Sequence, residues 1–153
     1  MNILLASLAL VIAGALTKWN DNKIDETNSS SYVFAVLILV LLAYGVYEFR
    51  AGDAALGVLL GLLLTGKIDH PSHWISVLPL FFLFSGNITA VLIFTVASFL
   101  DEHEIVGRWF SRLAALFYAP IAPQYLTALL LFDVGYNLAA LVWRILNASR
   151  TEH

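Results

Sequence analysis

Long apolar segments alternate with short polar stretches along most of the chain. Five segments are clearly apolar, and they cover residues 2–17, 32–49, 54–66, 74–100 and 124–146. A helix that crosses a membrane needs about 20 apolar residues, with a range of roughly 17–25. The pattern therefore predicts an all-α protein, a polytopic transmembrane helical bundle that forms a single integral membrane domain over residues 1–153.

A sixth segment, residues 106–121, is amphipathic: its large apolar side chains fall on one stripe of a helix and its arginines on the other. It is either an interfacial helix that lies flat on the membrane or a short span that ends near Pro120. We therefore expect five or six helices. The eight Lys and Arg residues divide five against three between the two sides in either case, so the positive-inside rule does not choose an orientation.

The third apolar segment is short for a membrane span. Residues 54–66 carry Gly57, Gly61 and Thr65 at four-residue spacing. Small residues at this spacing let helices approach each other closely in lipid. We therefore expect this segment to be buried inside the bundle.

The fourth apolar segment is long and contains potential helix breakers. Residues 74–100 include Pro79 and, near their middle, Ser85-Gly86-Asn87. Broken helices are tolerated at membrane depth where protein or water satisfies the freed backbone groups. We expect either one kinked helix or two half-helices that meet at this break.

The composition favours lipid as the surrounding solvent. Hydrophobic residues make up 60% of the chain and charged residues 12%, with a mean hydropathy of +0.83, whereas soluble domains have about 25% charged residues. The net charge of -3 and the lack of a basic tract argue against a nucleic-acid partner. The first segment lacks a positively charged start, so we expect a retained helix and not a signal peptide. We expect a multi-pass protein surrounded by membrane lipid, in the cell membrane of a prokaryote.

Charged and imidazole side chains gather in two polar stretches, residues 18–31 and 67–73. If the second and third segments both span the membrane, these two stretches lie on the same face. Carboxylate and imidazole groups are suitable ligands for Mg, Mn or Zn. A metal-activated water is a common means of hydrolysing or transferring phosphoryl groups at neutral pH. We therefore expect a divalent metal, and its predicted ligands are Asp21, Asp25, Asp69, His70 and His73.

Several of the same residues are candidates for the chemistry itself. The predicted catalytic residues are Asp21, Asp25, Asp69 and His70, and the residues expected to bind an anionic substrate group are Lys18, Asn20 and Lys67. Asp21 and Asp25 are four residues apart, so a helix that continues this far would place both carboxylates on one face. The alternative is that charged residues at helix ends simply meet water and lipid headgroups.

Residues 64–74, LTGKIDHPSHW, resemble part of a family of membrane-bound metal-dependent hydrolases of the YdjM type. In that family an Asp-x-Asp-His-Pro stretch follows a hydrophobic segment, and Asp69, His70 and Pro71 match its last three positions. Lys67 stands where the family has its first Asp, and the family's HRG-x-TH motif is absent from this chain. The resemblance implies metal-dependent hydrolysis at a membrane.

Asn20-Asp21 together with Asp25 is similar to the ND-x-x-D motif of UbiA prenyltransferases. Here one more residue separates the two aspartates, and the chain of 153 residues is far shorter than that fold requires. The similarity implies an isoprenoid-type substrate.

Further polar residues lie within or beside the apolar segments. Asp101 or Glu102 is placed to cap the following helix and to meet its positive end. Asp133 lies mid-segment, where an ionisable group costs about 2.5–3.5 kcal/mol and so needs a partner or a cavity. Asp133 and Asn137, facing Asn87, would form a midplane pocket for a proton, a cation or the polar head of a lipid substrate. The alternative for these side chains is an interhelical hydrogen bond that serves assembly alone.

Three hypotheses of function follow from these residues. The leading one is an integral membrane enzyme, metal-dependent, that acts on an amphipathic lipid- or isoprenoid-type substrate bearing phosphate, at the membrane surface. The second is a small cation- or proton-coupled transporter or channel that uses Asp133. The third is a non-catalytic subunit of a larger membrane complex or a homo-oligomer. The sequence leaves open whether the chain is an enzyme at all.

Overall fold

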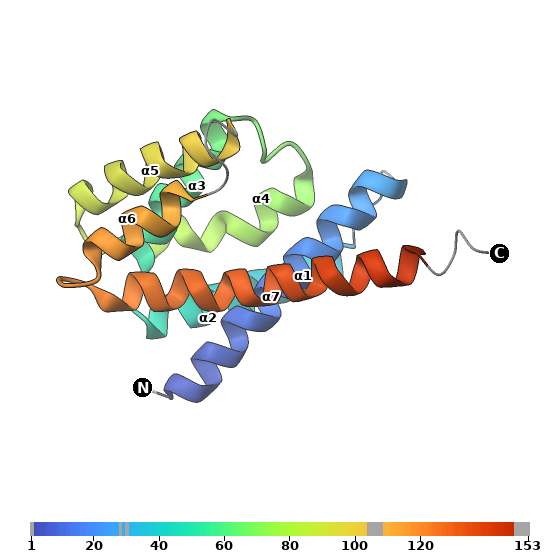
Figure 1. The fold of residues 1–153 in the computed structure, drawn as a ribbon, viewed down its shortest axis with the longest axis horizontal. Coiled ribbons are helices and arrows are strands. Elements are labelled where there is room, and N and C mark those ends of the chain that lie inside the picture. Colours follow the sequence, from blue (N-terminus) through green and yellow to red (C-terminus); the bar gives the residue numbers. More distant parts are fainter. Residues whose placement is uncertain (1, 28, 30, 104–108, 149–153) are drawn as a thin grey trace.

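The computed structural model of this chain describes residues 2–27, 29, 31–103 and 109–148. These residues form seven α-helices and one short 3-10 helix, and none of them belongs to a strand. In chain order (Figure 1) the elements are α1 (Ile3–Thr27), α2 (Tyr32–Glu48), α3 (Gly52–Leu64), α4 (Pro71–Val77), η1 (Leu78–Phe82), α5 (Ile88–Glu102), α6 (Phe110–Tyr118) and α7 (Pro123–Ala148). The prediction of an all-α fold is confirmed.

Two helices in the described part of the chain, α1 and α7, are long and apolar enough to cross a membrane, and α2 and α3 are apolar but shorter. The amphipathic segment contributes α6, which has nine residues; its first part, residues 104–108, lies outside the described residues. Nine residues make a helix about 13.5 Å long, against a hydrocarbon core of about 30 Å. The helix lengths therefore give weak support for a membrane protein and do not confirm five or six spans.

α1 is longer than the apolar segment predicted, because it continues from residue 17 to Thr27. Neither Gly nor Pro interrupts residues 15–27, so nothing in the sequence ends the helix earlier. Its last turns are tied to α7: Trp143 Nε1 and Asn147 Nδ2 donate hydrogen bonds of 3.0 and 3.1 Å to Oε1 of Glu26. This polar extension of α1 carries several of the predicted site residues.

α1 and α7 run in the same direction and cross at close range (Figure 1). A Cβ atom on Gly135 would lie 1.8 Å from the backbone oxygen of Val11, and one on Gly14 would lie 2.1 Å from that of Phe132. The backbones can approach this closely because both residues lack a side chain.

A second close contact joins α3 to α5. A Cβ atom on Gly57 would lie 2.6 Å from the backbone oxygen of Val91, and one on Gly61 would lie 2.7 Å from that of Thr95. The glycines of the predicted small-residue face of α3 are therefore used for helix packing, and Thr65 is the C-cap residue of α3.

The long apolar segment at residues 74–100 is broken. α4 and η1 precede the break, α5 follows it, and the chain reverses direction between them (Figure 1). Gly86 has a φ of +106°, which a residue with a side chain rarely adopts, and Asn87 caps α5 by accepting from the backbone N–H of Ala90 at 3.0 Å. Of the two alternatives, the half-helices are correct and the continuous kinked helix is wrong.

The small helix α6 turns its small residues inward and its large ones outward. Ser111, Ala114 and Ala115 are buried against the rest of the bundle, whereas Phe117 is 82% exposed and Leu116 is 58% exposed. Small residues allow α6 to lie close to α5 and α7. The predicted apolar stripe therefore faces away from the protein.

Candidate functional site

The candidate site lies where the polar extension of α1 meets the start of α4. Nε2 of His73 lies 3.2 Å from Oδ1 of Asp21, and Nδ2 of Asn20 donates to Oγ of Ser72 at 3.2 Å. Two neighbouring residues of α1 thus contact two neighbouring residues of α4. The two polar stretches, residues 18–31 and 67–73, are therefore in contact, and the membrane face on which they lie stays a prediction. We call this group of residues the α1–α4 cluster.

Local sequence explains how α4 presents its side chains to α1. Pro71 occupies the first position of α4, where its missing N–H leaves no hydrogen bond unmade. His70 is the N-cap residue, and its Nδ1 accepts from the backbone N–H of Ser72 at 3.3 Å. The following residues therefore begin a helix at a defined point, with Ser72 buried and His73 half-buried against α1.

His73 lies between two carboxylates that come from different segments of the chain. Besides its contact with Asp21, its Nδ1 lies 3.5 Å from Oδ1 of Asp69. The hydrogen bond with Asp21 raises the pKa of His73 above its usual range, and the charges of both carboxylates act in the same direction, while burial opposes them. The site therefore favours the imidazolium form of His73.

α7 completes the surroundings of Asp21. The hydroxyl of Tyr136 donates to Oδ2 of Asp21 at 3.3 Å, so the two oxygens of this carboxylate contact two different elements. The ammonium group of Lys18 lies 5.3 Å from the centre of the Tyr136 ring, a cation–π distance. Tyr136 was not predicted from the sequence, where it is one aromatic residue among many in an apolar helix.

The other predicted residues of these two stretches are more peripheral. Asp25 is exposed one turn beyond Asp21 on α1. Lys67 forms an exposed ion pair of 3.5 Å with Glu102 at the end of α5. Within the described ranges, no group of three or more His, Asp or Glu side chains is placed to hold a metal ion. The divalent metal stays a prediction.

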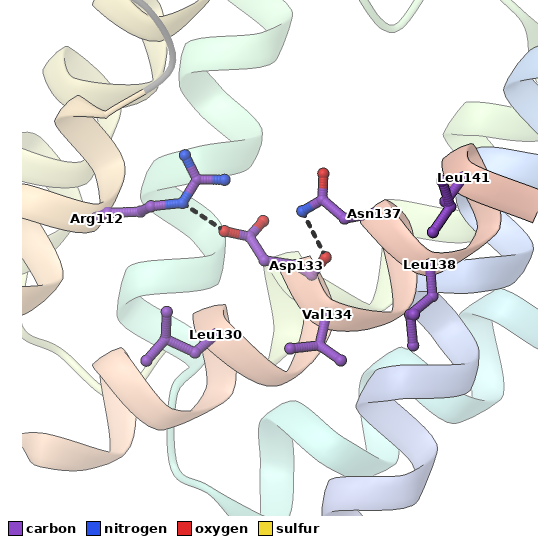
Figure 2. Close-up of a pocket in the computed structure, with 7 residues that line it drawn as sticks. All are labelled: Arg112, Leu130, Asp133, Val134, Asn137, Leu138 and Leu141. Atoms are coloured by element: carbon purple, nitrogen blue, oxygen red, sulfur yellow. Dashed lines mark hydrogen bonds and ion pairs between the residues drawn. The ribbon is translucent and has the colours of Figure 1, made fainter. Parts of the chain in front are cut away.

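Asp133 forms a second polar place, on α7. Nε of Arg112 donates to Oδ2 of Asp133 at 2.8 Å, and Nδ2 of Asn137 donates to the backbone oxygen of Asp133 at the same distance (Figure 2). Together these residues line an open groove of about 460 Å³, whose other walls are Leu130, Val134, Leu138 and Leu141.

The predicted pocket of Asp133, Asn137 and Asn87 does not form. The side chain of Asn87 caps α5 and contacts Tyr125 near the start of α7, whereas Asp133, two turns further along α7, takes its charged partner from α6. Asp133 and Asn137 do line one groove, but the prediction was wrong for Asn87, because the N-cap of α5 and Tyr125 engage its side chain.

A buried acid that the sequence analysis missed joins three parts of the fold. Asp53, near the start of α3, is 1% exposed. It accepts hydrogen bonds from the backbone N–H of Ser85 at 2.8 Å, from the hydroxyl of Ser85, and from the hydroxyl of Tyr125 at 3.1 Å. The predicted third segment begins at Ala54, one residue after Asp53, and the sequence pattern assigned no role to Asp53. The sequence did contain a signal. Asp53 lies beside one apolar segment and Ser85-Gly86-Asn87 interrupts another, and a carboxylate can accept hydrogen bonds from the polar groups of such a break.

Asp101 has the capping role that the sequence predicts. Its two carboxylate oxygens accept from the backbone N–H groups of Phe110 and Ser111, at 2.6 and 2.9 Å. The first N–H groups of a helix have no acceptor within the helix, and this carboxylate accepts from two of them in α6. Its negative charge also interacts favourably with the positive end of the helix dipole.

No known protein family, no curated protein and no solved structure matches this chain. The short resemblances to membrane hydrolases and to prenyltransferases gain no support from these comparisons. Function therefore has to be argued from the geometry of the described residues.

Proposed function

We propose that this chain is a multi-pass membrane protein. Large apolar side chains are exposed on most of the described helices and loops, and Phe82, Phe117 and Ile121 are each at least 80% exposed. The closest helix contacts are made instead by glycine, alanine and serine. Lipid tails are as apolar as leucine, so helices in a membrane associate through small residues and leave the large ones outside.

The helix arrangement also supports one orientation of the protein in the membrane, which the count of Lys and Arg residues in the sequence left open. α1 and α7 end side by side, with the rings of Trp19 and Trp143 4.8 Å apart, and the α1–α4 cluster lies at this same end. Of the six Lys and Arg residues in the described part of the chain, Arg50 belongs to the opposite end and Arg112 pairs with Asp133 along α7. The other four belong to this end: Lys18, Lys23, Lys67 and Arg144. By the positive-inside rule this end faces the cytoplasm.

We infer that the chain is an enzyme with an acid–base centre at this cytoplasmic surface, acting on an amphipathic substrate that bears phosphate. The single observation that carries this proposal is the position of His73 between Asp21 and Asp69. The two carboxylates orient the ring and stabilise its protonated form, and a positioned imidazolium is a general acid. Lys18 supplies positive charge near Asp21 for an anionic phosphate.

The proposal is tested with the full chain reconstituted in lipid nanodiscs. The probe is dodecyl phosphate, and the measurement is release of inorganic phosphate. We expect His73→Gln and Asp21→Asn to lower kcat by about 10²–10⁴-fold, as removal of an acid–base group does. His103→Gln is the matched control, because His103 is exposed at the end of α5 and its ring packs on Phe99.

Three outcomes decide the proposal. Turnover that is lost in His73→Gln and kept in His103→Gln supports it. Full activity of His73→Gln, or no turnover by the unaltered chain, contradicts it. A chelator arm tests the predicted divalent metal separately, since loss of turnover on chelation would show that the reaction requires a metal.

The groove beside Arg112 and Asp133 favours a second candidate, a proton- or cation-coupled carrier. It combines an ion pair with an apolar wall on α7 (Figure 2). Arg112 neutralises Asp133, so a transported cation has to displace the guanidinium before it can bind the carboxylate. Asp133→Asn should abolish pH-dependent ion flux into liposomes, and unchanged flux in this variant would remove the candidate.

A further inference from the structure

One face of α7 is exposed in a single copy of the chain. α7 packs on α1 at Gly135, and the side chains on its other side are large and apolar. Leu130, Val134 and Leu141 are 45%, 50% and 55% exposed, and they line the groove beside the ion pair described above (Figure 2). Asn137 lies among them and indicates what covers this face.

Asn137 is exposed, and its side chain makes a single hydrogen bond. Its Nδ2 donates to the backbone oxygen of Asp133, one turn earlier on the same helix. A primary amide has a second N–H proton and a carbonyl oxygen, and within the described part of the chain neither of these makes a hydrogen bond. Hydrocarbon offers no replacement partner, so an amide left in this state inside a membrane costs free energy.

The position of Asn137 along α7 excludes a lipid headgroup as the missing partner. α7 has 26 residues, so it is about 39 Å long, and Asn137 lies about 16 Å from its nearer end. The hydrocarbon core of a membrane is about 30 Å thick. If α7 crosses this core, Asn137 lies inside the hydrocarbon for every placement of the core along the helix.

The spacing of the exposed residues fits a pair of parallel helices. Four of them are separated by four, three and four positions: Leu130, Val134, Asn137 and Leu141. This is the spacing of a coiled-coil seam, and at about 100° per residue the four side chains fall within about 60° of the helix circumference. A single polar Asn in such a seam specifies the register of the two helices and the number of copies that associate.

We propose that two copies of the chain pair in the membrane along this face of α7, with the Asn137 amides of the two copies hydrogen-bonded to each other. The inference goes beyond the proposed reaction and rests on the proposal that the chain crosses the membrane in one orientation. Two copies with the same orientation are related by a two-fold axis along the membrane normal, which brings identical residues together at one depth. Each amide gives its second N–H proton to the carbonyl oxygen of the other, so the unused groups of both copies are satisfied.

The pairing face is tested by disulfide cross-linking of the full chain in liposomes with a large excess of lipid. The chain contains no cysteine, so a single introduced cysteine reports on its own position. Val134→Cys and Val36→Cys are a matched pair, because both valines are 50% exposed, Val134 on the proposed face and Val36 on α2. Under mild oxidation we expect covalent dimers from Val134→Cys and only the background of random collisions from Val36→Cys. Cross-linking of Val134→Cys that is no faster than that of Val36→Cys overturns the proposal.

The role of Asn137 is tested by sedimentation equilibrium in density-matched detergent micelles. Asn137→Leu keeps the size of the side chain but removes both interhelical hydrogen bonds, so we expect the dissociation constant of the dimer to rise by about tenfold or more. Asn137→Gln keeps the donor and the acceptor and should change it by less than about threefold. Tyr47→Leu is the control, since Tyr47 is an exposed polar side chain on α2. An unchanged dissociation constant in Asn137→Leu, or an equal rise in Asn137→Gln, contradicts the pairing of the amides.

Extraction of the membranes with alkaline carbonate separates failure of the dimer from failure of the membrane proposal. A chain that carbonate removes is not inserted, which contradicts the membrane proposal itself. A chain that stays inserted but is monomeric overturns the dimer alone. Native mass spectrometry then identifies the occupant of the groove: a monomer that retains a lipid, or that pairs only with a different protein, also overturns the dimer.

Discussion

Asp53 offers the sharpest test of how this fold is held together, because one carboxylate joins α3, the break at Ser85 and α7. Replacing it with alanine removes the acceptor for both hydrogen bonds from Ser85 and for the one from Tyr125. Ser85 is exposed and can turn to water, whereas Tyr125 is 5% exposed and its hydroxyl has no such replacement. The two partners should therefore contribute unequally.

The expected cost follows from these contacts. A buried donor left without an acceptor costs about 1–3 kcal/mol, which applies to the hydroxyl of Tyr125. Each hydrogen bond that water can replace contributes about 0.5–1.5 kcal/mol, which applies to the two from Ser85. We therefore expect Asp53→Ala to lower the free energy of unfolding by about 2–6 kcal/mol, and Tyr125→Phe alone to lower it by about 1–2 kcal/mol.

A double-mutant cycle isolates the contact between the two residues. Unfolding in mixed detergent micelles is followed by titration with SDS for the unaltered chain, for Asp53→Ala, for Tyr125→Phe and for the double variant. In the Asp53→Ala background the hydroxyl is already unsatisfied, so Tyr125→Phe should cost nothing or stabilise the protein. Tyr32→Phe, an exposed tyrosine, is the control and should change stability by less than about 0.5 kcal/mol. An equal cost of Tyr125→Phe in both backgrounds would refute the reasoning.

Three further predictions use the same unfolding assay. Asp101→Ala should cost about 1–2 kcal/mol, because two backbone N–H groups of α6 lose their acceptor. Gly135→Ala should lower the free energy of unfolding by more than Gly45→Ala does. The added methyl group meets the backbone of α1 in Gly135→Ala, but a movable leucine side chain in Gly45→Ala. Equal losses would contradict the close contact of α1 with α7. Asp21 raises the pKa of His73, so this contact stabilises the fold fully below the unfolded-state pKa of about 6.5, and the stabilisation is lost as pH rises through the folded-state pKa. Between pH 5.5 and 8.5 the unfolding free energy should fall in the unaltered chain by more than in His73→Gln, and parallel curves would contradict this assignment.

The α1–α4 cluster shows how far local pattern reaches toward a site. The polar stretches follow apolar segments, and two membrane spans between them would place Asp21 and His73 on one face; the structure shows that these two residues are in contact. The partners from α7 and α6 were not predictable in the same way. Tyr136 reaches Asp21, and Arg112 reaches Asp133, only because of the angles and offsets at which their helices pack. Those quantities are set by side-chain fit between helices, which hydropathy does not encode.

The sequence by itself determined the helical class and the small-residue face of α3, and it left two alternatives each for the segment around Ser85-Gly86-Asn87 and for the residue that caps α6. Each of these follows from residues close together in the chain, where helix periodicity, capping and glycine conformation act. The tertiary structure alone decided that Asp53 is buried and that Asn87 does not meet Asp133. The physical reason is that the burial and pairing of a polar group depend on which distant segments of the chain approach it.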